Sequence, residues 1–152
     1  MSYPKKQGLY DPAYEKENCG IGFVANMKGR GSHKIVRDGI EILNKLEHRG
    51  ACGSDPLTGD GAGLLIQIPH SFFKKECLKI DINLPEEGKY GTGLVFFPKD
   101  VRIHSFLDVF NKVIQQEGLS LLGWRKLPVD NTTIGAVARE AEPEIWQPFI
   151  GQ

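Results

Sequence analysis

Apolar residues recur along this chain with two different spacings, and the shorter spacing predicts strands. Residues 21–27 alternate between apolar and small or polar side chains, the period of a half-buried strand. Two other segments are short apolar runs that end at Pro69 and Pro98. Such runs are typical of buried strands, and proline ends them because it has no backbone N–H to donate to a neighbouring strand. The pattern therefore predicts four strands: Ile21–Met27, Leu64–Ile68, Tyr90–Phe97 and Leu119–Val129.

The longer spacing, near 3.6 residues, predicts helices. Residues 33–48 follow Ser32, a favourable N-cap, and stop at a cation and a glycine. Residues 100–116 carry the strongest signal, with apolar side chains at i, i+3, i+4, i+7 and i+8 before Gly118. Weaker patterns predict short helices over His70–Cys77 and Ile134–Arg139, and a further strand that begins at Pro143. The fold class predicted from this mixture is α/β, or α+β.

Composition narrows the classes of function. Nineteen basic and nineteen acidic side chains balance among 152 residues, which gives no electrostatic footprint for nucleic acid or an anionic membrane surface. No apolar run approaches the roughly 20 residues that a helix needs to cross a bilayer. The polar leader lacks the apolar stretch of a secretory signal, and three cysteines form neither a disulfide framework nor a metal-ligand pattern. We therefore expect one domain, or part of one, in the cytoplasm and with reduced thiols.

Cys19 is the most informative residue, because it stands at the start of a predicted strand behind a short polar leader. A free cysteine is most often a buried space-filler. The alternative is that Cys19 becomes the first residue of the mature protein. Its own α-amine, with an ordinary pKa of about 7.7–8.0, could then act as the base for its thiol. Gly20 and Gly22 on either side of Ile21 indicate a close backbone approach.

Two further segments have both a purely structural and a functional interpretation. His48 and Arg49 at a helix end are, by default, cations that complement the helix dipole, but Arg49 could instead face the same cleft as Cys19. The glycine run 59–63 follows a turn and opens a strand. It therefore predicts a tight turn rather than a phosphate cradle, and a carboxylate such as Asp60 there more often bonds its own backbone than a cation. Cys52 and Cys77 are expected to be inert thiols.

Several motifs in order resemble a known family. The segments that carry the resemblance are Leu9-Tyr10-Asp11-Pro12, Glu17 to Phe23, Leu46 to Ala51, Thr58 to Gly63, Gly123 to Asn131 and Ala141-Glu142-Pro143. Together they resemble the start of the glutamate synthase large subunit, whose amino-terminal domain is a class II glutamine amidotransferase. The resemblance covers essentially the whole chain.

The resemblance implies a fold, a maturation step and a reaction. The fold is the αββα sandwich of the N-terminal nucleophile hydrolases, of which this chain holds the N-terminal part. Residues 1–18 are implied to be a propeptide and residues 19–152 the N-terminal portion of the amidotransferase domain. Cys19 is implied to hydrolyse the side-chain amide of glutamine to glutamate and ammonia, with Arg49 and Gly50 binding substrate or organising the site. The ammonia would then aminate 2-oxoglutarate.

The same resemblance assigns the remaining chemistry elsewhere. FMN and an iron–sulfur cluster are implied only for other domains or subunits of the parent enzyme, and no cofactor or metal is expected in this segment. The oxyanion-hole Asn-Gly pair and the groups that hold glutamine are implied to lie after Gln152; this chain has no Asn-Gly dipeptide. We therefore expect little glutaminase activity from the 152 residues alone, and self-association or poor solubility through an uncovered sheet face.

Three hypotheses stay open at this point. The chain is the nucleophile-bearing part of a glutaminase, a truncated non-catalytic or regulatory homologue, or a half-domain completed by a partner chain. The mass of the mature N-terminus separates the first from the second, because only a maturing enzyme loses residues 1–18.

Overall fold

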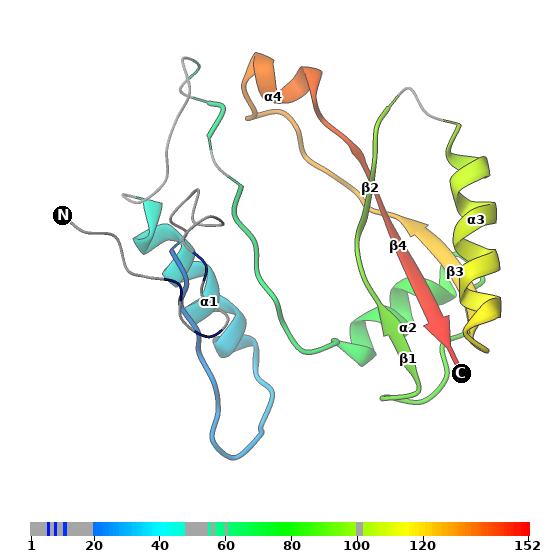
Figure 1. Ribbon diagram of the computed structural model, residues 1–152. Coiled ribbons are helices and arrows are strands. Elements are labelled where there is room, and N and C mark those ends of the chain that lie inside the picture. The colour runs from blue at the N-terminus through cyan, green and yellow to red at the C-terminus, as the bar shows by residue number, and fades with distance from the viewer. Residues whose placement is uncertain are drawn as a thin grey trace. The chain divides into compact units, whose positions relative to one another are not determined.

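The structure is a computed structural model that describes residues 6, 8, 11, 20–47, 55, 57–59, 61–99 and 102–152 (Figure 1). The chain divides into two compact units. The smaller unit comprises Met1–Ala51 with Asp60–Leu64, and the larger comprises Cys52–Gly59 with Leu65–Gln152.

The smaller unit is built on one helix, α1 (His33–Lys45). Ser32 is its N-cap residue, as predicted, with extended backbone, and its carbonyl accepts a hydrogen bond from the Ile35 N–H at 3.1 Å. The helix ends at Lys45 with Leu46 as C-cap, earlier than the predicted end at residue 48. The partly buried apolar positions, among them Ile35, Ile42 and Leu46, recur at helical spacing on one face of α1.

The predicted strands Ile21–Met27 and Leu64–Ile68 are wrong for the described structure, where both segments are without regular structure. A strand requires a neighbour that completes its hydrogen-bonded ladder, and neither segment has one among the described residues. Their side chains are correspondingly exposed: Ile21 and Phe23 are each 88% exposed and Leu65 is 101% exposed. The alternating pattern shows that these residues would suit a β-sheet, but a segment forms a strand only when a neighbouring strand pairs with it.

The larger unit contains one antiparallel sheet around a central strand, β4 (Glu144–Gly151). Along one edge of β4 lie β1 (Tyr90–Thr92) and β2 (Val95–Phe97), and along the other lies β3 (Ser120–Lys126). The single strand predicted for residues 90–97 is therefore two short strands that pair with different halves of β4. The pairing of β3 is interrupted between Leu121 and Gly123, where one extra residue forms a bulge.

Two helices cover opposite faces of this sheet (Figure 1). Helix α2 (His70–Leu78) contributes Phe73, whose ring meets Phe149 edge-on at 5.3 Å. Helix α3 (Ile103–Gln116) contributes Phe110, whose ring lies 4.9 Å from Trp124. Trp124 pairs with Pro148, the neighbour of Phe149 on β4, and successive residues of a strand point to opposite faces.

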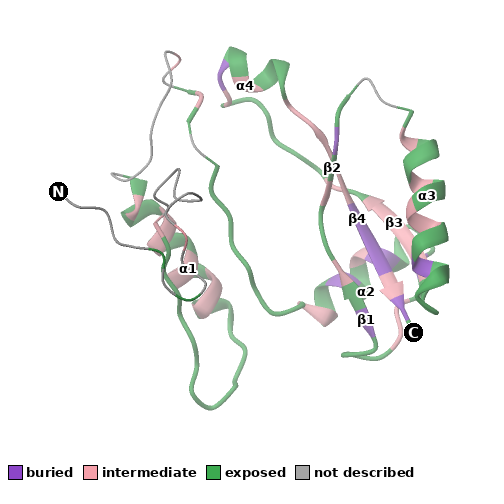
Figure 2. Ribbon diagram, in the orientation of Figure 1, coloured by how far each residue is buried: buried purple, intermediate pink, exposed green. Residues whose placement is uncertain are grey.

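Burial concentrates on β4 and on the elements that contact it (Figure 2). Phe149 and Cys77 are completely buried and form a cluster with three other core residues: Phe73, Ile82 and Tyr90. The predicted helix over 100–116 is confirmed over Ile103–Gln116, and Gly118 ends it with φ of 71°. The short helix α4 (Ala136–Glu140) and the strand predicted from Pro143 are confirmed as well.

The combination of helices with an antiparallel sheet confirms the predicted α/β class. Within the described ranges, none of the helices combines the length and apolar character required to traverse a bilayer.

Candidate functional site

The three residues predicted to form the site, Cys19, Arg49 and Gly50, lie outside the described residues, as do His48, Cys52 and Asp60. Their proposed roles therefore stay predictions. The described residues beside them do show how the flanking chain is held. Gly20 follows Cys19 directly, and Leu46 and Glu47 precede the predicted His48-Arg49-Gly50 turn.

The segment after Cys19 lies directly against α1. A methyl group at Gly20 would come within 3.0 Å of Leu46 Cδ2, and one at Gly22 would come within 2.5 Å of Ile42 Cγ2. Real Cβ atoms essentially never approach another heavy atom closer than 3.0 Å. The close backbone approach that the two glycines predicted is thus confirmed, with a helix rather than a strand as the neighbour.

The two contacts define an antiparallel register between the segment and α1. Moving two residues toward the N-terminus, from Gly22 to Gly20, moves the contact from Ile42 to Leu46, one helical turn toward the C-terminus. Two residues of extended chain span about 6.6–6.8 Å, and the four residues from Ile42 to Leu46 correspond to a helical rise of about 6.0 Å. The spacing of the glycines therefore matches the spacing of the helix positions that receive them.

The glycine run ends beside the middle of the same helix. A methyl group at Gly39 would lie 3.1 Å from Leu64 Cδ2. Residues 61–69 contain no helix, and the next helix starts only at His70. A phosphate cradle of the dinucleotide-binding kind opens a helix directly, so this part of the chain does not have that architecture.

The larger unit contains a polar contact that links the turn segment 55–58 to α4. The Asp55 carboxylate accepts the Leu57 N–H at 3.0 Å and the Thr58 hydroxyl at 2.9 Å. These two bonds, with smaller contributions from the N–H groups of Val137 and Ala136, hold the pKa of Asp55 below its ordinary value. Asp55 and Thr58 thus supply acceptors to the N-terminus of a short helix that begins without a side-chain cap of its own.

Sequence reasoning missed this contact, although a signal was present. An aspartate that bonds the N–H two residues ahead forms an Asx turn, and Asp55 stands in a run of turn residues. Its link to α4 joins positions far apart in the chain, which no local pattern reveals.

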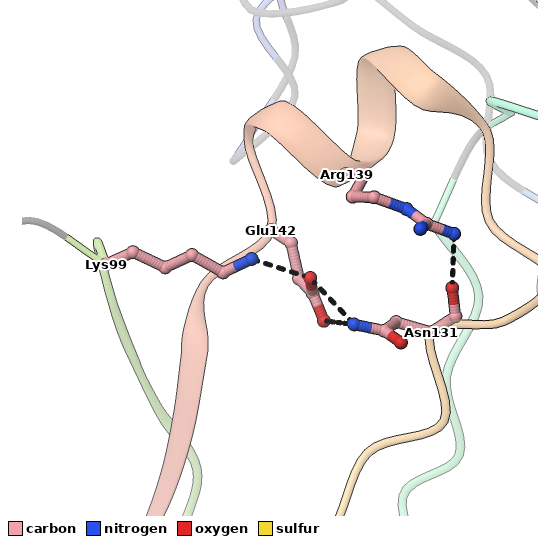
Figure 3. Close-up of polar contacts among 4 residues, drawn as sticks. All are labelled: Lys99, Asn131, Arg139 and Glu142. Atoms are coloured by element: carbon pink, nitrogen blue, oxygen red, sulfur yellow. Dashed lines mark hydrogen bonds and ion pairs between the residues drawn. The ribbon is translucent and has the colours of Figure 1, made fainter.

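A second polar cluster joins the end of β2 to the segment before β4 (Figure 3). Lys99 Nζ lies 2.7 Å from Glu142 Oε2, and Asn131 donates to both Glu142 oxygens at 3.2 Å. Arg139 donates to the Asn131 carbonyl at 2.9 Å. The bonds from Lys99 first, and from Asn131 next, lower the pKa of Glu142.

A shallow hollow of about 180 Å³ lies beside this cluster. The charged side chains that line it pair with one another: Lys99 with Glu142 at 2.7 Å, and Lys126 with Glu144 at 2.9 Å. Because these charges are already neutralised internally, the arrangement ties loops together rather than presenting a charged site to a ligand.

Cys77 shows why a buried thiol is a poor nucleophile. The side chain is completely buried between α2 and β4, and this burial raises its pKa, so the thiolate is disfavoured. Among the described residues, no three histidine, cysteine or acidic side chains gather in a way that could hold a metal ion.

Comparisons with known proteins identify the family. The family model for class II glutamine amidotransferases matches residues 19–152. The glutamate synthase [NADPH] large chain of Bacillus subtilis is 51% identical over 149 residues, which is 97% of this chain and 10% of that relative. The glutamate synthase [NADH] of Saccharomyces cerevisiae is 48% identical over 97% of this chain and 7% of its own length. A chloroplastic ferredoxin-dependent glutamate synthase of Arabidopsis thaliana is 37% identical over 97% of this chain and 9% of its own length.

This chain thus spans a tenth or less of the length of these relatives. The family match covers most of the chain, and its mixed helices and antiparallel sheet are consistent with such a domain. The chain therefore belongs to the class II glutamine amidotransferases, a family of enzymes.

Proposed function

We propose that this chain is the nucleophile-bearing part of the glutaminase domain of a glutamate synthase. In this proposal residues 1–18 are a propeptide, and Cys19 is the first residue of the mature enzyme. The observation that carries the proposal is that the family match begins at residue 19. A cysteine at the first matched position is where a terminal nucleophile is required, because only a terminal residue carries both a thiol and a free α-amine.

The proposed reaction uses both groups of Cys19. The α-amine accepts the thiol proton, and Sγ attacks the side-chain carbonyl carbon of glutamine to give a tetrahedral oxyanion. The α-ammonium then returns the proton to the departing nitrogen, which leaves as ammonia. Water hydrolyses the remaining thioester, releasing glutamate and restoring the thiol. An α-amine with an ordinary pKa of about 7.7–8.0 can exchange this proton near neutral pH.

The described contacts support a site role for Arg49 and Gly50. Gly22 lies against Ile42 and Gly20 against Leu46, so the segment runs antiparallel to α1. Gly20, the residue after Cys19, thus lies against Leu46, which is only three residues before Arg49 in the sequence. We infer that Arg49 and Gly50 organise the site or bind substrate, and that Arg49 does so as a fixed charge, because a guanidinium stays charged and does not take part in proton transfer.

The products and partners of the whole enzyme are part of the same proposal. The ammonia would aminate 2-oxoglutarate in other domains, since the similar proteins are named glutamate synthases and are far longer than this chain. Any flavin or iron–sulfur chemistry is assigned to those domains.

The test uses the longest native polypeptide that contains this segment. Glutamine-dependent ammonia release is measured for the wild type and for the Cys19→Ser, Cys52→Ser and Cys77→Ser variants. Cys19→Ser keeps the α-amine but replaces the thiol with a much weaker nucleophile, so turnover should be nearly lost. The other two variants should remain active whenever they fold. Turnover by Cys19→Ser at the wild-type rate would refute the proposal.

A further inference from the structure

We propose that Ile42 of α1 and Leu46, the C-cap residue of that helix, are positioning residues for Cys19. Their side chains form a surface against which the backbone of residues 20–22 packs, and this close packing requires glycine at positions 20 and 22. The inference rests on the proposed function, because it assigns a catalytic consequence to the placement of residue 19. The contacts from which it is argued, at Gly20, Gly22, Ile42 and Leu46, all lie among the described residues.

The requirement for glycine here is steric and not conformational. Where a glycine of the described chain has a positive φ, as at Gly29 and Gly118, that backbone itself disfavours other residues. Gly20 and Gly22 have no such φ, so alanine could adopt their backbone without strain. What excludes a side chain at these positions is the proximity of α1.

The two contacts differ in how easily they could yield. At position 22 the obstacle is Ile42 Cγ2 at 2.5 Å, a methyl group attached directly to the β-carbon of a β-branched residue. Such a side chain in a helix has one strongly preferred χ1 rotamer and cannot turn its branch away cheaply. At position 20 the obstacle is the end of the Leu46 side chain, at 3.0 and 3.3 Å. The contact at Ile42 is therefore strict and the contact at Leu46 more tolerant.

The consequence for catalysis follows from the distance that must be restored. Ordinary van der Waals contact begins at 3.4 Å, whereas a methyl group at position 22 would stand at 2.5 Å. The segment would have to move away from α1 by about 1 Å, and Cys19 lies only three residues upstream. A misplacement of about 1 Å at a reacting group can lower the rate by about 10²-fold.

The test compares single and double variants in the longest native polypeptide that contains this segment. Gly22→Ala should lower kcat for glutamine hydrolysis by about 10²-fold while leaving KM nearly unchanged, because the nucleophile moves and the rest of the pocket does not. Adding Ile42→Ala removes Cγ2 and should restore most of kcat. Adding Ile42→Val keeps Cγ2 and should restore none.

Two further variants keep the proposal falsifiable. Gly31→Ala is the matched control, since that glycine has open space around its α-carbon and no positive φ, and it should leave kcat unchanged. If Gly22→Ala does not fold, the milder Gly20→Ala and its rescue by Leu46→Ala decide the question in the same way. Thermal midpoints, measured alongside, separate a displaced nucleophile from an unfolded domain.

The outcomes also separate this inference from the proposed function. A silent Cys19→Ser with a fully active Gly22→Ala would overturn only the positioning role. Equal restoration by Ile42→Ala and Ile42→Val, or restoration by neither in folded protein, would overturn it too. A fully active Cys19→Ser would instead overturn the proposed function itself.

Discussion

Truncation of Phe149 to alanine should remove a large part of the stability of the larger unit. Phe149 is 0% exposed in the central strand, and its ring lies 5.3 Å from Phe73 and 6.2 Å from Tyr90. Full burial of such a side chain contributes about 1.5–3 kcal/mol, and an edge-to-face aromatic pair adds about 0.5–1.5 kcal/mol. With the cavity left behind, the free energy of unfolding should fall by about 3–5 kcal/mol.

The matched control is Phe72→Ala, because Phe72 is also a phenylalanine beside Phe73 but is 50% exposed. Half of the burial contribution amounts to about 1 kcal/mol. Urea unfolding followed by tryptophan fluorescence measures both variants, since the chain's two tryptophans, Trp124 and Trp146, lie in the larger unit. A loss below about 1.5 kcal/mol for Phe149→Ala, or equal losses for the two variants, would refute this account of the core.

Two other predictions concern the bulge in β3 and the α4 contact. Gly123→Ala would place a methyl group 2.6 Å from Ile82 Cδ1, so the free energy of unfolding should fall by about 1–3 kcal/mol. Gly91→Ala is the control, because the space around that glycine is open, and it should be nearly neutral. Equal effects of the two variants would contradict the assigned contact. Asp55→Asn should lower stability at pH 7. The pKa of Asp55 in the folded protein lies below its ordinary value, so the carboxylate charge stabilises the fold above about pH 3.9. The difference in stability between the variant and the wild type should therefore shrink as the pH falls through the folded pKa. A difference in unfolding midpoint that does not change with pH would argue against this.

The parts of the fold that the sequence predicted well are those specified by local pattern. The apolar spacing of residues 100–116 and the stop at Gly118 suffice to predict α3, and a favourable cap with an amphipathic run suffices for α1. The sequence also predicts a strand starting at Pro143, but it does not indicate the central place of that strand in the sheet. No local signal shows that Glu144–Gly151 becomes the central strand with partners on both edges, because pairing depends on segments distant in sequence.

The errors have the same physical origin. Ile21–Met27 has a strand pattern, yet the described structure provides it with a helix as neighbour and no ladder partner. The break between β1 and β2 also escapes a periodicity argument, since Gly93 and Leu94 continue the apolar run. A strand is defined by its neighbour as much as by its own residues.

The candidate site was predicted from chemistry and resemblance rather than from local pattern. The glycines at 20 and 22 predicted a close approach, and the contacts with α1 confirm one. The roles of Cys19, Arg49 and Gly50 remain predictions, because geometry at these positions lies outside the described residues. Composition alone favoured a buried, inert Cys19, and the family match from residue 19 is what argues against that interpretation.

The most direct test of the central claim is ammonia release from glutamine with and without residues 1–18 attached. The longest native polypeptide containing this segment is prepared in two forms, one matured to a Cys19 N-terminus and one in which removal of the leader is blocked. Intact mass spectrometry verifies each N-terminus before the assay. The account predicts turnover only for the form that begins at Cys19, because a peptide-bonded nitrogen at residue 19 cannot act as the base. Equal turnover by the form that keeps residues 1–18 would contradict the terminal-nucleophile mechanism.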